Sequence, residues 1–141
     1  MCMMVYVAAE NELPLMEWGR DKHNVLCVRP LNFYSSNDQL ADINLAMPYK
    51  YHMCSWQGCG CGFSFDFDDN SYDEEQNTLG KQSVQALFDY IRTHVKGDEC
   101  EILSFWAGDG IEHDGGALDL RGLVVGDRFE FLEGQLLSVT K

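Results

Sequence analysis

Hydrophobic and polar positions along the first half of the chain predict short strands and one short helix. The stretch 3–8 is apolar throughout, which predicts a buried strand, and 25–28 predicts a second strand that ends at Arg29-Pro30. In 36–46, apolar residues alternate with polar ones at spacings that favour a short helix, with Ser36 or Asn37 as its cap.

The second half contains the strongest periodic signal. In 78–96 hydrophobic residues recur every three or four positions, which predicts one long amphipathic helix followed by Gly97 after its C-cap. The stretch 101–107 predicts a strand packed beside this helix. Farther on, 128–132 and 135–140 flank Glu133-Gly134, which predicts a hairpin turn with a positive φ at the glycine.

Aromatic-rich stretches on both sides of a glycine- and cysteine-containing turn predict a further hairpin. The two strands would be 49–56 and 61–67, joined through Gly58-Cys59. This register makes Cys54 and Cys61 diagonal neighbours on one apolar face, about 7–8 Å apart at the backbone. Both thiols are then expected to be buried among aromatic rings.

These elements fit a single domain covering residues 1–141. Several strands joined as hairpins and one long helix predict the α+β class, with a largely antiparallel or mixed sheet and the helix on one face. A chain of this length is long enough to bury its own hydrophobic core.

Charge narrows the choice of partners. The chain carries 23 acidic against 10 basic residues, a formal net charge of -13. Such a field repels phosphate groups, so neither nucleic acid nor an anionic membrane is an expected partner. No apolar run approaches the roughly 18 residues of a membrane helix, and no secretory signal pattern is present, so a cytoplasmic protein is expected.

The segment Gly58-Cys59-Gly60-Cys61-Gly62-Phe63, here called the box, carries the most distinctive chemistry. Its two cysteines, together with Cys54 and His52, have the atom types of a soft tetrahedral metal site, so zinc is a candidate cofactor. The spacing lacks the paired C-x₂-C pattern of most structural zinc sites. Inert packing in a core and a redox pair between Cys59 and Cys61 are the alternatives.

The chain resembles a family of small bacterial proteins without an assigned activity. The resemblance rests on the opening 2–8, on the box, and on the closing segment 131–137. It implies one domain with a shared fold over nearly the whole chain. It implies no catalytic residue.

Two polar loops are weaker candidates. Asp66, Asp68 and Asn70 match the first ligand positions of a calcium-binding EF-hand loop, but Ser71 replaces its glycine and Asn77 replaces its glutamate. The loop from Asp109 to Asp114, with Glu112 and His113, offers carboxylates and an imidazole for general acid/base catalysis, which would make the protein an enzyme.

The leading interpretation is a small acidic domain that acts by binding or assembly without catalysis. Aromatic residues outside the predicted core favour a protein partner or a homo-oligomer. These residues are Trp18, Tyr49, Tyr51 and Trp106.

Overall fold

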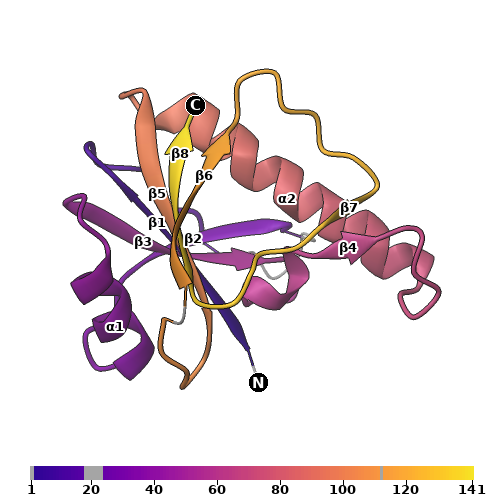
Figure 1. Cartoon of the computed structure of the whole chain (residues 1–141), viewed down its shortest axis with the longest axis horizontal. Helices are drawn as coiled ribbons and strands as arrows, with labels where there is room; N and C mark the ends of the chain where they lie inside the picture. Colours follow the sequence, from indigo (N-terminus) through magenta and orange to yellow (C-terminus); the bar gives the residue numbers. More distant parts are fainter. Residues whose placement is uncertain (1, 18–23, 112) are drawn as a thin grey trace.

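A six-stranded sheet forms the centre of the protein, with one helix on each face (Figure 1). The computed structural model describes residues 2–17, 24–111 and 113–141. The strands follow the order β2-β3-β1-β5-β8-β6, and a separate two-stranded sheet contains β4 and β7. The predicted α+β class is therefore confirmed.

Along the chain, the strands and helices follow the order β1, β2, α1, β3, η1, β4, α2, β5, β6, β7 and β8. The six strands of the large sheet are β1 (Met3–Ala9), β2 (Leu26–Pro30), β3 (Tyr49–Ser55), β5 (Glu99–Trp106), β6 (His113–Asp119) and β8 (Gln135–Thr140). The small sheet consists of β4 (Phe65–Asp66) and β7 (Arg128–Phe129). The helices are α1 (Ser36–Asn44), α2 (Glu74–His94) and the 3₁₀ helix η1 (Gly60–Gly62).

The sheet is mixed because one of its neighbouring pairs is parallel. Strand β1 pairs antiparallel with β3 and β5, and β5 pairs antiparallel with β8. Edge strand β6 runs parallel to β8. Pro30 ends the opposite edge strand β2, where a missing N–H removes no ladder hydrogen bond inside the sheet.

Side-chain alternation along β1 gives the sheet two apolar faces. Val5 and Val7 pack in the core under α2, whereas Tyr6 and Ala8 pack in a second cluster that includes Ala41 of α1. The α2 core also contains Leu87, together with other helix residues at three- and four-residue spacing. Both faces of the sheet are thus covered by amphipathic helices.

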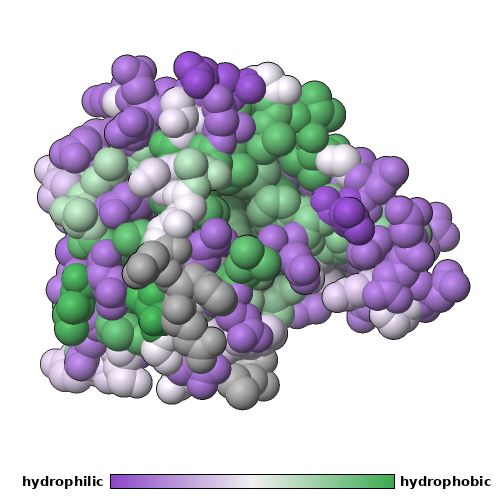
Figure 2. Space-filling model, in the orientation of Figure 1, coloured by the Kyte–Doolittle hydropathy of each residue, from purple (hydrophilic) through white to green (hydrophobic). Residues whose placement is uncertain are grey.

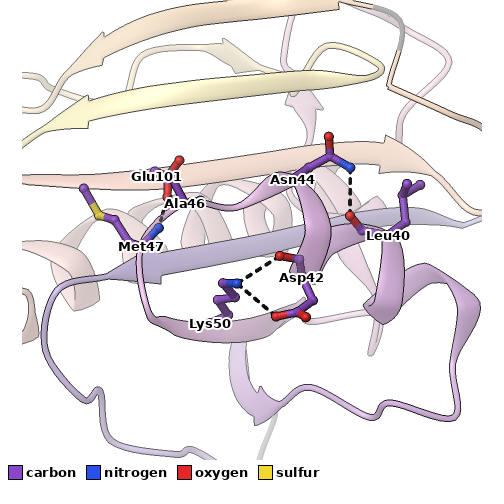
Figure 3. A network of polar contacts seen from close by, with 7 residues as sticks. All are labelled: Leu40, Asp42, Asn44, Ala46, Met47, Lys50 and Glu101. Atoms are coloured by element: carbon purple, nitrogen blue, oxygen red, sulfur yellow. Dashed lines mark hydrogen bonds and ion pairs between the residues drawn. The ribbon is translucent and has the colours of Figure 1, made fainter.

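Polar contacts fix the end of α1 against the sheet (Figure 3). The ammonium group of Lys50 donates to the backbone carbonyl and to the carboxylate of Asp42, both at 2.9 Å. A carboxylate oxygen of Glu101 accepts from the backbone N–H groups of Ala46, at 2.9 Å, and Met47, at 2.7 Å. These contacts tie the α1–β3 connection to β5.

Helix boundaries differ slightly from the prediction. The long helix occupies 74–94, so it begins four residues earlier than the periodic pattern, because Asp73 caps it by accepting from the N–H of Gln76. Its C-cap is Val95 in extended geometry, and Gly97 has no positive φ. The short helix is capped by Ser35, one residue before the predicted cap.

Neither of the two predicted hairpins forms, although the glycine conformation predicted for one of the two turns is present. Strand β4 contains only two residues and pairs with β7, so it does not return along β3. Strand β8 pairs with β5 and β6, so it does not pair with β7. Gly134 does have a positive φ of 64°, as the sequence predicts. Local alternation identifies strands, but it does not determine their partners.

Candidate functional site

The box folds as a compact turn that ends in η1 and covers the start of β1. The backbone N–H and the hydroxyl of Ser55 both donate to the carbonyl of Cys59, at 2.9 and 2.5 Å. The N–H of Gly58 donates to the carbonyl of Ser55 at 2.9 Å, and Gly58 has a φ of 81°, a conformation that favours glycine. These bonds turn the chain back immediately after β3.

Two further glycines let the box lie flat on its neighbours. A Cβ atom at Gly60 would lie 2.5 Å from the carbonyl oxygen of Met3 and 2.8 Å from a methyl carbon of Val5. A Cβ atom at Gly62 would lie 2.2 Å from the hydroxyl oxygen of Ser55. The alternating glycines therefore permit close packing against β1 and β3.

This packing brings three cysteine thiols together. The sulfur atoms of Cys2, Cys59 and Cys61 lie within 4.8 Å of one another. Cys2 immediately precedes β1, and its carbonyl accepts from the N–H of Ala107 at 2.8 Å. Cys2 is exposed, whereas the other two are half-buried. We call these three residues the thiol cluster.

Backbone N–H groups donate to the sulfur atoms of Cys61 and Cys59. The N–H of Met3 donates to the sulfur of Cys61 at 3.2 Å. Burial raises the pKa of the Cys59 thiol, and the adjacent thiols of Cys61 and Cys2 raise it further, while the backbone N–H of Cys61 acts in the opposite direction. A bound cation would lower the pKa of Cys59 and so oppose the effects of burial and of the adjacent thiols, because its positive charge stabilises thiolates that otherwise repel one another.

Cys54 and His52 do not belong to this cluster, which corrects the metal site expected from the sequence. They alternate with Met53, which packs under α2, and so face the other side of the sheet. Cys54 lies opposite Cys27 on β2, and both side chains are fully buried. Cys61 packs beside the α2 core, so the expected proximity of Cys54 and Cys61 is wrong.

Burial favours the uncharged forms of Cys54 and His52. Burial raises the pKa of Cys54 to about 11 and lowers the pKa of His52, which favours the neutral form of each. The ring of His52 stacks on Tyr6 with 5.0 Å between centroids. The hydroxyl of Tyr6 donates to the carboxylate of Asp38 at 2.6 Å.

The other predicted positions are dispersed. In the acidic loop, Asp69 accepts from the N–H and the hydroxyl of Ser71, at 2.9 and 2.7 Å, and these contacts lower the pKa of the exposed Asp69. Asp109 is exposed after β5. The side chains of Glu112, His113 and Asp114, and the whole of Trp18, lie outside the described residues.

The aromatic residues expected to face a partner have different environments. Tyr49 is exposed, Trp106 is half-buried, and Tyr51 is buried with its hydroxyl accepting from the N–H of Leu13 at 2.9 Å. Tyr51 is therefore a core residue. Within the described residues, no helix is long and apolar enough to cross a membrane.

Two adjoining cavities open beside the box. One, of about 470 Å³, extends from Cys61 and Trp106 to Glu130. The other, also about 470 Å³, extends from Glu130 to Asp69 and Arg128. Because the two share Ser64, Tyr72 and Glu130 in their lining, they form one continuous groove.

Comparison with known proteins yields no match to a family model, a curated protein or a solved structure. The family suggested by the box and the two ends of the chain therefore stays a prediction. The thiol cluster is the arrangement with the clearest chemistry, and the sequence missed its third member. Cys2 is 57 residues away from Cys59, and only the pairing of β1 with its neighbours connects the two.

Proposed function

We propose that this protein binds a soft metal ion, Zn²⁺ or Cu⁺, through the thiolates of Cys2, Cys59 and Cys61. The observation that supports this proposal is the mutual separation of at most 4.8 Å among the three sulfur atoms. Sulfur atoms bound to one ion at about 2.3 Å lie about 3.8–4.0 Å apart, so movements of less than about 1 Å would complete the site. Thiolates are the preferred ligands of both ions.

The hydrogen bond from Met3 to Cys61 supports the same proposal. An N–H group aimed at a sulfur atom stabilises a thiolate and holds it in a fixed direction. The box contributes two ligands from a hydrogen-bonded turn, and Cys2 contributes the third from the position just before β1. Ligands from separate elements are already positioned before an ion arrives, which lowers the entropic cost of binding.

The metal would not be required for folding. A structural zinc site normally has four protein ligands, whereas this cluster offers three thiols. The chain also has an extensive core under α2 that does not depend on the cluster. The function consistent with these features is a small acidic domain that binds a metal ion without catalysis, with an accessible fourth coordination position.

The test is metal binding by the reduced protein and by single variants of each cluster cysteine. Elemental analysis and native mass spectrometry measure the ion, and chromophoric chelators measure its affinity. We expect one ion per chain in the wild type, and at least tenfold weaker binding in Cys2→Ser, Cys59→Ser and Cys61→Ser. The control is Cys54→Ala, which removes a buried cysteine and leaves the cluster intact.

The outcome of the control separates the two possible metal sites. Loss of binding in Cys54→Ala, with normal binding in Cys2→Ser, would place the metal at the site expected from the sequence and overturn the proposal. A reduced wild-type protein that binds neither ion would also overturn it. A mass 2 Da below the reduced mass, retained by Cys54→Ala and lost in Cys59→Ser, would indicate a disulfide in place of a metal site.

A further inference from the structure

The groove beside the box has an aromatic floor. Phe63 and Phe131 meet edge to face with 6.2 Å between ring centroids, and Phe129 meets Phe131 in the same manner at 5.0 Å. Tyr72, which is 40% exposed, and Trp106 stand at its sides. Such walls provide apolar contact for a methylene chain and ring faces that attract cations.

Carboxylates dominate the polar part of the lining. The lining contains the carboxylates of Asp66, Asp69, Glu130 and Glu133 and a single guanidinium group, that of Arg128. The ion pairs within residues 2–17, 24–111 and 113–141 involve other groups, so none of these carboxylates is neutralised by Arg128. The groove therefore has a strongly negative potential, which the net charge of -13 reinforces.

The four carboxylates differ in whether they already accept hydrogen bonds from the protein. Asp66 accepts from the N–H of Asp68, and Asp69 from Ser71. Glu133 accepts from the indole N–H of Trp106. Glu130 makes no hydrogen bond or ion pair within the described part of the chain, and it lies where the two cavities join. It is therefore the carboxylate best placed to pair with a ligand.

We infer that this groove binds an aliphatic polyamine, with its methylene segments on the aromatic floor and its ammonium groups at Glu130 and the other carboxylates. Each cavity has a volume in the range typical of small-molecule sites. A lining that combines aromatic rings with carboxylates suits a ligand that combines methylene segments with ammonium groups. The groove adjoins the thiol cluster at Cys61, but polyamine binding uses the carboxylates and aromatic rings and does not require a metal ion.

The test is calorimetric titration with spermidine, supported by NMR chemical-shift mapping. We expect saturable binding at one site per chain, with shifts at Tyr72, Trp106 and Glu130. Glu130→Gln should weaken binding about tenfold, because a charge-assisted hydrogen bond is lost. Glu10→Gln is the matched control, since Glu10 is exposed just after the far end of β1 and its loss changes net charge equally.

Three results would overturn the inference. Equal weakening in Glu130→Gln and Glu10→Gln would indicate diffuse attraction to an acidic protein. If Mg²⁺ bound the groove as tightly as spermidine does, the aromatic floor would make no contribution to polyamine binding. Binding of a tri-arginine peptide at least tenfold tighter than spermidine would indicate a basic protein segment as the occupant. Repeating the titration with Cys2→Ser separates this site from the metal site, because Cys2 belongs to the thiol cluster but does not line the groove, so polyamine binding should persist in that variant.

Discussion

Replacing Gly60 by alanine tests whether the close approach of the box to β1 creates the thiol cluster. The added Cβ would lie 2.5 Å from the carbonyl oxygen of Met3 and 2.8 Å from a methyl carbon of Val5. Carbon atoms pack at about 3.5–4.0 Å, so the box must move away by about 1 Å. Neither neighbour can yield easily, because both belong to a central strand of the sheet.

The expected effect has two parts. Overpacking of this kind costs about 1–3 kcal/mol, so we expect a free energy of unfolding about 2 kcal/mol lower. The displacement also lengthens the hydrogen bond from Met3 to Cys61 and separates Cys2 from the box. Loss of such supporting contacts typically weakens metal binding about 10–100-fold, although all three cysteines remain.

Urea denaturation, followed by tryptophan fluorescence, measures the free energy of unfolding, and competition with a chelator measures the metal affinity. The control is Gly126→Ala, because nothing lies within 4 Å of a Cβ atom there and its φ is not positive. We expect this control to change stability by less than about 0.5 kcal/mol. A Gly60→Ala variant with wild-type stability and metal affinity would refute the argument that glycine is required for the geometry of the cluster.

Two further predictions concern buried polar and titratable groups. Tyr6→Phe removes a 2.6 Å hydrogen bond to the buried carboxylate of Asp38 and should lower the free energy of unfolding by about 1.5–3 kcal/mol, measured by urea denaturation; no change would show that the bond does not contribute. Burial raises the pKa of Cys100 from 9.0 to about 12. As the pH rises, the thiol of the unfolded chain loses its proton before the buried thiol of the folded protein does. The free energy of unfolding is therefore unaffected by the titration of Cys100 below pH 9 and falls by about 1.4 kcal/mol per pH unit as the pH rises toward 12. Cys100→Ala should show a correspondingly smaller loss of stability over that interval, and an unchanged slope would contradict the prediction.

Several elements follow from local sequence patterns. The apolar stretch at the start predicts β1, and hydrophobic spacing of three and four residues predicts α2, because each pattern matches the period of its backbone geometry. The positive φ of Gly134 follows from the residue type. Figure 2 shows hydrophilic residues over the protruding tip that carries the β4–α2 connection, which agrees with the acidic composition of that loop.

Strand pairing could not be predicted from local sequence patterns. The sequence between Tyr49 and Phe67 reads as a hairpin, but the backbone turns at the box and β4 pairs with a strand more than 60 residues later. Alternation specifies which side chains share a face of one strand, and it contains no information about the strand alongside. The predicted link between Cys54 and Cys61 failed for this reason.

The sequence by itself determined the fold class, the long helix and the presence of an unusual glycine-cysteine turn. Only the tertiary structure decided which thiols meet, since Cys2 reaches the box through the packing of β1 under Gly60 and Cys54 faces the opposite side of the sheet. The physical reason is the distance along the sequence over which each effect acts. Propensity and periodicity act over a few residues, whereas a site assembled from distant segments depends on sheet order and on close backbone contacts.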